Sequence, residues 1–337
     1  MIKEAINLVI QNISLSEAET AECMTEIMEG RATDAQIGAF LTALRIKGET
    51  IAEITGAARI IREKATKILA PEGIVDTCGT GGDLSNTFNI STAAAMVVAA
   101  SGIPVAKHGN RSVSSRSGSA DLLEALGVNV DLPPDRVEKC LFETNFGFLF
   151  APLFHPAMKF AIGPRREISI RTIFNILGPL TNPANAKRQV VGVFSSRLTE
   201  LLASVLGNLG AVDAMVVHGE DGMDEITTCN ATKVSRYRNK VIENFYIMPE
   251  DYGFKLADIT DLTGGDNKEN AGIILSIFNN NVESPKRDIV LLNAAAAIVV
   301  SGHTEDFGAA KEIADEAIRS GKAAKKLEEI IKVTNAL

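Results

Sequence analysis

The spacing of apolar residues divides the chain into a helical N-terminal part and a longer part in which strands alternate with helices. Over residues 1–70 apolar side chains recur every three to four positions, as they do across 51–61, and this period is typical of amphipathic helices. Capping boxes at 16–19 and 50–53 mark two helix starts, because a hydroxyl and a glutamate satisfy free backbone N–H groups there. The pattern predicts a small all-helical domain.

The helix expected over residues 36–46 carries more apolar side chains than one face needs, among them Ile37, Phe40, Leu41 and Leu44. A helix in a small domain has to bury such a surface, either against the rest of the chain or against a second subunit. The apolar excess leads us to expect these four residues at the contact of a homodimer.

From residue 74 onward the period changes to short apolar runs separated by helical patterns. Strand-like runs cover 74–77, 103–106, 128–132, 147–151, 190–194 and 214–218, and helices are expected over 91–101, 120–126, 135–143 and 198–209. Such alternation indicates a largely parallel sheet covered by helices. Residues 225–248 indicate an antiparallel meander with its turn near 239–240, and alanine-rich helices end the chain.

The predicted fold is therefore of the α/β class, with a small all-helical domain and a larger α/β domain built on a mostly parallel central sheet. The helical domain covers residues 1–70 and is expected to be joined by helices from about 156–187, and the α/β domain covers 71–337. In such sheets ligands bind beyond the carboxyl ends of the strands.

Composition and charge restrict the class of function. The chain has 337 residues, of which 46% are hydrophobic, and this suffices for a substantial core. A formal net charge of −8 argues against a nucleic-acid or membrane-surface partner. The four cysteines show no C-x-x-C spacing. The most apolar helix, over 289–300, is shorter than the roughly 20 residues of a membrane span. We expect a cytoplasmic protein that binds neither nucleic acid nor membranes.

Glycine and polar residues are concentrated after the first strand-like run, where the sequence reads Asp76-Thr-Cys-Gly-Thr-Gly-Gly-Asp83. Its three glycines permit positive φ and close approach of a ligand, and hydroxyl and amide groups continue to Thr92 at the next helix start. Leu84 stands in the third glycine place of a dinucleotide fingerprint, and the sequence has no P-loop motif. The stretch is interpreted as a cradle for several phosphate oxygens; the alternative is an ordinary glycine-rich turn.

A second polar cluster follows the run at 103–106. It begins Lys107-His-Gly-Asn-Arg111 and continues in serines to Ser119. In a parallel sheet this cluster lies at the same edge as the glycine-rich stretch, so a donor-rich loop and a basic loop together are suited to a polyanion. The alternative is a solvated basic turn.

Two further groups of residues suggest a metal and a carboxylate. Asp224 and Glu225 follow the run at 214–218, and hard oxygen ligands on a turn suit Mg²⁺ that also binds substrate phosphate. An exposed acidic turn is the alternative. Arg165 and Arg166 offer a guanidinium fork for a carboxylate, and ordinary charge on a helix surface is the alternative there.

Taken together, these motifs resemble those of the anthranilate phosphoribosyltransferase family over nearly the whole chain. The stretches that carry the resemblance are Asp76–Asp83, Asn89–Thr92, Lys107–Ser115, Gly118–Asp121, Arg171–Pro183 and Asp224-Glu225. The resemblance implies a homodimer, a nucleoside phosphorylase/phosphoribosyltransferase-like fold, and a catalytic site between the helical and α/β domains. It also supplies the substrates, phosphoribosyl pyrophosphate and anthranilate.

The resemblance also implies site residues, position by position. Phosphoribosyl pyrophosphate would be bound by Gly79, Gly82, Asp83, Thr87, Asn89, Ile90, Ser91 and Thr92, and by Lys107, His108, Gly109, Asn110, Arg111, Ser112, Val113, Ser114, Ser115 and Ser119. Mg²⁺ would be held by Ser91, Asp224 and Glu225, and anthranilate by Gly79, Asn110 and Arg165. Lys107, Asp224 and Glu225 would be the catalytic groups.

The implied reaction is displacement of pyrophosphate from the anomeric carbon of the ribose by the amine of anthranilate. Positive charge develops on the ribose as pyrophosphate leaves, so catalysis would rest on positioning and charge stabilisation. The aniline nitrogen is already neutral, so His108 is expected to shape its loop and not to act as an indispensable base. Two rivals remain, a pyrimidine nucleoside phosphorylase of the same fold and a nucleic-acid-binding relative without catalysis.

Overall fold

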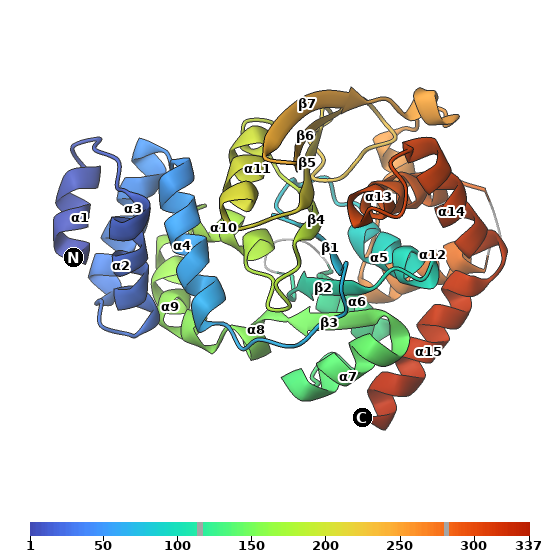
Figure 1. The fold of residues 1–337 in the computed structure, drawn as a ribbon, viewed down its shortest axis with the longest axis horizontal. Helices are drawn as coiled ribbons and strands as arrows, with labels where there is room; N and C mark the ends of the chain where they lie inside the picture. Colours follow the sequence, from blue (N-terminus) through green and yellow to red (C-terminus); the bar gives the residue numbers. More distant parts are fainter. Residues whose placement is uncertain (113–116, 280–282) are drawn as a thin grey trace.

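The computed structural model describes residues 1–112, 117–279 and 283–337, and its centre is one seven-stranded sheet (Figure 1). The strands are β1 (Val75–Gly79), β2 (Val105–Gly109), β3 (Phe146–Phe150), β4 (Arg188–Gly192), β5 (Asp213–Gly219), β6 (Thr232–Arg238) and β7 (Val241–Ile247). They lie in the order β3-β2-β1-β4-β5-β6-β7, with β1 to β5 parallel and with β6 and β7 antiparallel at one edge. The prediction of a mostly parallel central sheet is confirmed.

The N-terminal part is helical, as the apolar period predicts, and lies at the left of Figure 1. Its helices are α1 (Ile2–Val9), α2 (Glu17–Met28), α3 (Asp34–Lys47) and α4 (Ile51–Lys64). Capping boxes start α2 at Ser16 and α4 at Thr50, and a third, at Thr33, starts α3. Helix α9 (Lys159–Ile168) packs on α2 and α3, so this later segment lies against the N-terminal helices.

The other helices form a layer on each face of the sheet. One layer contains α5 (Ile90–Ala100), α6 (Ser119–Ala125), α12 (Asn267–Phe278), α13 (Pro285–Ser301), α14 (Phe307–Arg319) and α15 (Lys322–Ala336). The other contains α7 (Pro134–Thr144), α8 (Ala151–Phe154), α10 (Phe174–Leu177) and α11 (Leu198–Asn208). The 3-10 turns are η1 (Pro156–Met158), η2 (Gly178–Leu180), η3 (Pro249–Tyr252) and η4 (Ile259–Leu262). Because strand side chains alternate, Val190 packs in the first layer and Val191 in the second.

One hydrophobic core joins the N-terminal helices to the second face of the sheet. Buried side chains of α1 to α4 cluster with those of α10 and α11 and with strand residues such as Val191 and Val216. Arg62 on α4 ties the same parts together, because its guanidinium donates to the carbonyls of Leu180 (2.5 Å) and Leu209 (3.2 Å). The helical part is therefore packed against the sheet domain and shares a hydrophobic core with it.

Ile37, Phe40, Leu41 and Leu44 of α3 lie in this core and are at most 1% exposed. The expectation that these residues form the contact of a homodimer is therefore wrong. Both α1 and α9 pack against α3, which explains why so much of its surface is apolar. The apolar excess belongs to a helix that is buried within its own chain.

The strand expected over residues 128–132 is not formed. Val128, Val130 and Leu132 are buried and the two residues between them are exposed, so the apolar alternation is real. However, the N–H of Asn129 donates to Thr334 Oγ1 (3.3 Å) and not to a neighbouring strand. An extended segment that packs on one side gives the same period as a strand, whether or not it joins a sheet.

The antiparallel hairpin expected over 233–247 is formed by β6 and β7. Asn239 and Lys240 make its two-residue turn with φ of 52° and 63°, and left-handed backbone at both positions suits the twist of a hairpin. The hairpin is not a separate meander, because β6 pairs with β5 and so extends the sheet. Residues 225–231 belong to the turn that precedes it and contain no strand.

Helix α13, which contains the most apolar run of the sequence, is a core helix. Every residue from Ile289 to Val300 is buried, and α13 packs on β1, β4, β5, α5 and α14. Within the described ranges, the structure contains no helix whose length and apolar character would let it span a membrane.

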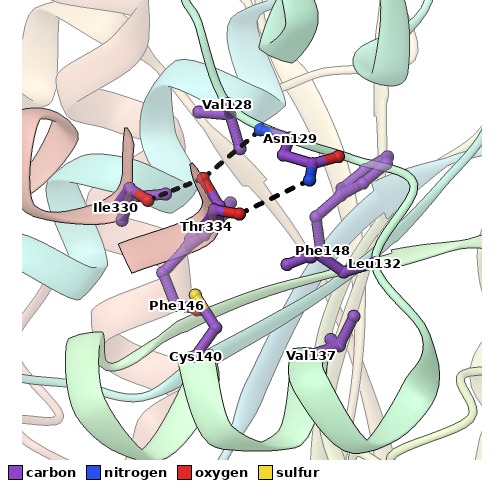
Figure 2. A pocket seen from close by; sticks show the side chains of 9 residues that line it. All are labelled: Val128, Asn129, Leu132, Val137, Cys140, Phe146, Phe148, Ile330 and Thr334. Carbon is purple, nitrogen blue, oxygen red and sulfur yellow. Dashed lines mark hydrogen bonds between the residues drawn. The ribbon is translucent and has the colours of Figure 1, made fainter. Parts of the chain in front are cut away.

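A small cavity lies between β3, α7 and α15, away from the polar motifs (Figure 2). It is lined by Val128, Asn129, Leu132, Val137, Cys140, Phe146, Phe148, Ile330 and Thr334. Its volume is about 10 Å³. A space of that size admits at most one water, so the cavity is not a candidate for a substrate site.

Candidate active site

The polar motifs meet where the strand order reverses direction. The chain runs outward from β1 to β2 and β3 and then returns to β4 on the other side of β1, and ligands bind in the crevice at such a switch point. At their carboxyl ends β1 and β4 pair through Gly79 and Gly192. A Cβ on Gly192 would lie 1.6 Å from the carbonyl oxygen of Asp224, and a Cβ on Gly79 would lie 2.8 Å from Asp224 Oδ2. Both glycines therefore make room for the turn that follows β5.

The glycine-rich loop between β1 and α5 has the backbone conformation that its glycines permit. Gly81 and Gly82 have φ of 65° and 76°, in the left-handed region. At the far end of the loop Thr87 forms an isolated β-bridge with Thr263, in the segment that precedes α12. The loop is thus anchored to a part of the chain that is distant in sequence.

Asn89, at the N-terminus of α5, connects the two loops of the sequence analysis. Its Nδ2 donates to the carbonyl of Ser117 (3.1 Å), and its Oδ1 accepts from Asn270 Nδ2 of α12 (3.1 Å). Ile90 and Thr92 follow it and are 1% exposed, and their N–H groups donate to the carbonyls of Phe88 (2.7 Å) and Asn89 (3.2 Å). The N–H groups at the start of α5 are therefore bonded to oxygens of the protein, and an anion at this helix start would have to compete for them.

Asp224 and Glu225 reach from the turn after β5 to the glycine-rich loop and to α5. Asp224 Oδ2 accepts from the N–H of Gly81 (2.7 Å), and Glu225 Oε1 accepts from the N–H of Ser91 (3.1 Å). The N–H of Asp224 donates to Asp83 Oδ2 (3.3 Å), so a third carboxylate is adjacent. Burial raises the pKa of Asp224, and Asp83 raises it further. Burial likewise raises the pKa of Glu225, with a further contribution from Asp224.

Lys107 brings a buried cation to the same side of the sheet. Its Nζ donates to the carbonyl of Thr77 and to Ser91 Oγ (3.3 Å). Burial lowers the pKa of Lys107, while Asp76 opposes that shift by favouring the charged form. Ser91 thus stands between the ammonium group of Lys107 and the carboxylate of Glu225.

His108 faces the opposite side of the sheet, because consecutive side chains of a strand alternate. Its Nδ1 lies 3.1 Å from the carbonyl oxygen of Gly178, and its Nε2 lies 3.2 Å from Nε2 of His155. Its N–H donates to Oδ1 of the buried Asp76 (3.1 Å). Burial, and then the neighbouring His155, lower the pKa of His108 to about 3. Burial lowers the pKa of His155 to about 4.

The cation of the second loop, Arg111, is engaged by carboxylates of α6. Its guanidinium donates to both oxygens of Glu124 (2.5 and 2.7 Å) and to Asp121 Oδ1 (3.2 Å). The N–H of Ser112 donates to Asp121 Oδ2 (3.0 Å). Arg111 is exposed, so these pairs are close to solvent, and an anionic ligand would compete for the same guanidinium.

The remaining residues of the second loop lie close to the start of α6. Ser119 Oγ donates to the carbonyl of Asn110 (3.2 Å), and a Cβ on Gly109 would lie 2.2 Å from that hydroxyl. The loop therefore packs tightly against Ser119 where it leaves β2. Val113, Ser114 and Ser115 lie outside the described residues.

Arg165 lies half-buried on α9, with its Cζ 5.0 Å from the centre of the Phe174 ring. Its guanidinium makes no hydrogen bond or ion pair with any described residue, and burial lowers its pKa. Such a cation is suited to a carboxylate supplied by a ligand. Arg171, shortly after α9, donates to the carbonyl of Gly82 and stacks 4.4 Å from the Phe194 ring centre. The segment after α9 therefore contacts the glycine-rich loop.

The donor set at the switch point fits a hard divalent cation. Asp224 and Glu225 each accept a backbone hydrogen bond, and neither forms an ion pair with a lysine or arginine among the described residues. Two carboxylates in a partly buried site resist ionisation and repel each other, and a cation removes both penalties. The described residues contain no group of three or more metal-ligating side chains, so a substrate or water would complete the coordination.

Sequence reasoning missed residues that shape this site from a distance. Gly192 interrupts a strand pattern, which signals close approach of another backbone. Asn293 is the one polar residue between Ile289 and Val300, and a lone amide in an apolar helix signals a specific partner. Neither residue belongs to a recognisable motif. Both signals become clear only when the contacts are known.

Two family models match the chain. The model described as the glycosyl transferase family, helical bundle domain, matches residues 3–65. The model described as the glycosyl transferase family, a/b domain, matches residues 71–324.

Individual relatives match over nearly their full length. A protein of Acetivibrio thermocellus named anthranilate phosphoribosyltransferase is 59% identical, over 100% of this chain and 97% of that protein. The crystal structure of a protein of that name from Thermus thermophilus superposes with a TM-score of 0.93 at 40% identity, covering 98% of this chain and 99% of the other. That from Saccharomyces cerevisiae, solved in complex with phosphoribosyl pyrophosphate and Mg, gives a TM-score of 0.91 at 27% identity, covering 100% and 98%.

The buried imidazole pair leads us to predict a loss of stability in mild acid. His108 and His155 have pKa values of about 3 and about 4 in the fold. A free imidazole has a pKa of about 6.5, so the unfolded chain takes up protons first as the pH falls. Stability is therefore complete above about pH 6.5 and should decrease below it, by about 2 kcal/mol for each imidazole at pH ~5.

Urea denaturation near neutral pH and at about pH 5 measures this decrease. His155→Gln should reduce the decrease by about 2 kcal/mol, because one of the two imidazoles is gone. His303→Gln is the matched control, since His303 is exposed, and it should behave as the unaltered protein does. An equal decrease in all three proteins would contradict the role of the buried pair.

Proposed function

The chain belongs to the anthranilate phosphoribosyltransferase family, and from this we propose how its residues carry out the reaction. The protein transfers the phosphoribosyl group of 5-phosphoribosyl 1-pyrophosphate to the amine of anthranilate in tryptophan biosynthesis, with N-(5-phosphoribosyl)anthranilate and pyrophosphate as products. The observation that carries our assignment of residues is the meeting of Lys107, Ser91 and the Asp224–Glu225 pair at the switch point.

In this proposal both loops bind phosphoribosyl pyrophosphate. The residues from the first loop are Gly79, Gly82, Asp83, Thr87, Asn89, Ile90, Ser91 and Thr92, and those from the second are Lys107, His108, Gly109, Asn110, Arg111, Ser112 and Ser119, with Val113, Ser114 and Ser115 outside the described residues. Backbone N–H groups at a helix start and a positive dipole end favour phosphate. Because the ring of His108 faces the other side of the sheet, His108 contributes to this loop through its backbone.

Asp224, Glu225 and Ser91 are proposed to hold Mg²⁺, which when bound supplies charge that stabilises the departing pyrophosphate. The raised pKa values of both carboxyl groups support this role. Burial and the neighbouring carboxylates disfavour the charged forms, and a bound cation would favour them. Lys107 approaches from the same side and neutralises part of the leaving group's charge. These groups act on charge that develops as the bond to pyrophosphate breaks.

Anthranilate is proposed to bind with its carboxylate at Arg165 and with contacts to Gly79 and Asn110. The unpaired, half-buried guanidinium of Arg165 supports this assignment. His155 lies in the segment that leads into α9, so the His108–His155 pair connects the second loop to the helix that carries Arg165. Binding both substrates in fixed geometry makes the bimolecular reaction effectively unimolecular, and this lowers the activation barrier.

The two rival functions account less well for the site. A pyrimidine nucleoside phosphorylase binds free phosphate and needs neither the half-buried carboxylate pair nor an arginine like Arg165, which has no hydrogen-bond or ion-pair partner among the described residues. A nucleic-acid-binding relative without catalysis is disfavoured by the net charge of −8 and by the engagement of Arg111 with Glu124 and Asp121.

We also propose a cytoplasmic homodimer, with a helical domain of residues 1–70 joined by α9 and α10 and an α/β domain of residues 71–337. The surface proposed for the dimer contact includes three exposed isoleucines of the helical domain, Ile10, Ile13 and Ile46, which are 65%, 45% and 82% exposed. Lys47 Nζ lies 3.4 Å from Ser14 Oγ, which brings Ile13 and Ile46 to the same end of the domain. Exposed isoleucines that gather in one place are typical of a contact surface.

Turnover should depend on a divalent cation held by the carboxylate pair. Asp224→Asn combined with Glu225→Gln should lower turnover at subsaturating Mg²⁺ by at least about tenfold, because several kcal/mol of charge stabilisation are lost. The measurement is the rate of phosphoribosylanthranilate formation across a range of Mg²⁺ concentrations. Asp131→Asn, at an exposed carboxylate, is the control. An unchanged Mg²⁺ dependence in the double variant would rule out the metal assignment.

Arg165→Ala should raise the KM for anthranilate far more than the KM for phosphoribosyl pyrophosphate. Loss of a charged hydrogen-bond partner costs about 1.5–3 kcal/mol, so an increase of roughly tenfold or more is expected. Arg166→Ala is a matched control, because Arg166 is the exposed neighbour on the same helix. If steady-state kinetics showed only the pyrophosphate substrate to be affected, Arg165 would belong to the other half of the site.

Replacing Ile13 and Ile46 together by glutamate should convert the homodimer to monomers, because two buried charges would be left unpaired in the contact. Light scattering gives the mass directly. Phe142→Glu is the control, since Phe142 is 55% exposed but lies on α7. A dimer that persists in the double variant would place the contact on another surface.

A further inference from the structure

We propose that Asn293 of α13 is a positioning residue that holds the Asp224–Glu225 pair in the orientation needed to bind a divalent cation. The proposal rests on the function proposed above and extends it to a residue outside every motif. Asn293 touches neither carboxylate. It acts on the backbone that immediately follows them.

The amide of Asn293 binds both backbone polar groups of Ile226. Asn293 Oδ1 accepts from the N–H of Ile226 (3.0 Å), and Asn293 Nδ2 donates to the carbonyl of Ile226 (2.8 Å). Ile226 is 0% exposed, so water cannot replace either bond without a change in packing. Two bonds to one residue fix its position and its rotation, and Ile226 is the next residue after Glu225.

The other side of the turn is equally constrained. Asp221 accepts from the N–H of Met223 (3.1 Å) and from Thr227 Oγ1 (2.5 Å), so it braces the turn on both sides of the carboxylates. The carbonyl of Asp224 rests on Gly192, where a Cβ would come within 1.6 Å. The turn that carries the carboxylate pair is therefore held in three places: by close packing on Gly192, by hydrogen bonds to Asp221 and by hydrogen bonds to Asn293.

The surroundings of Asn293 support the view that its amide is present to hold Ile226. The helix is apolar from Ile289 to Val300 except at this position, and Asn293 is 3% exposed. Its second amide proton goes to the carbonyl of Ile289 (2.8 Å), so both donors are used. A buried amide is costly unless its bonds are made, whereas an apolar side chain would pack without that cost. The gain has to come from the turn that it holds.

Asn293 and Glu225 also line one small cavity, together with Thr77, Cys78, Ser91, Ala94, Val190 and Gly192. The volume of this cavity is about 10 Å³. Asn293 therefore lies close to Glu225 in space, and its bonds to Ile226 link it to Glu225 along the chain. Residues that hold metal ligands in place typically change metal affinity by about 10- to 100-fold when they are replaced.

The first experiment compares Asn293→Ala with Val299→Ala, a buried residue of the same helix that makes no bond to the turn. The affinity for Mn²⁺ in the presence of phosphoribosyl pyrophosphate, measured by electron paramagnetic resonance, should fall about tenfold in Asn293→Ala and by less than about twofold in Val299→Ala. The KM for anthranilate should not change in either. Asn293→Ser, which also leaves room for a water, is the second variant to measure if alanine prevents folding.

The second experiment places Asn293→Ala in a Glu225→Gln background. If Asn293 acts through the carboxylate pair, its effect on Mn²⁺ affinity should shrink to within about twofold there, whereas a general loss of stability would add independently. Equal affinities in Asn293→Ala and Val299→Ala, with Glu225→Gln weakened, would overturn the role of Asn293 alone. An unweakened Glu225→Gln would overturn the metal assignment and this inference with it.

Discussion

The site depends on the contact between the acidic turn and the two glycines that end β1 and β4. Only because Gly192 lacks a Cβ can the backbone of Asp224 approach the carboxyl edge of the sheet, and the missing Cβ of Gly79 makes room for Oδ2 of the same residue. From there the turn reaches the N–H groups of Gly81 and Ser91, which belong to the loop and helix that the sequence marks as a phosphate cradle. The anion-binding loop and the cation-binding carboxylates are thereby assembled by one close approach of backbone to backbone.

The pleat of a single strand distributes the chemistry between two sides of the sheet. On β2, Lys107 turns toward α5 and the carboxylate pair, and the next residue, His108, turns toward His155 and the segment that leads to α9. The side with the ammonium group serves the leaving pyrophosphate in our proposal. The other side leads to Arg165 and the acceptor. Alternation along a strand, which requires no special sequence, is enough to separate the two halves.

The sequence was informative where local pattern and final structure coincide. The alternation of runs predicts the parallel sheet, and motifs at the ends of those runs predict which loops converge. It was misleading where burial has a source that is distant along the chain. Residues 128–132 alternate because they pack against the core, and α3, which carries Phe40, packs against α1 and against α9 from a later part of the chain. Gly192 and Asn293 matter through partners that no local pattern identifies.

One core runs from α1 through α11 to the second face of the sheet. The two domains are therefore separate along the sequence, but they depend on each other for stability. A cut near residue 70 would uncover the faces of α9 and α11 that pack on the N-terminal helices, and would leave Arg62 without the carbonyls of Leu180 and Leu209. Each fragment would lose part of this shared core, although the core on the other face of the sheet lies wholly within the longer fragment. The whole chain should therefore melt in a single cooperative transition, and the helical part cannot be exchanged between relatives as an independent module without also exchanging α9 and α11, on which it packs.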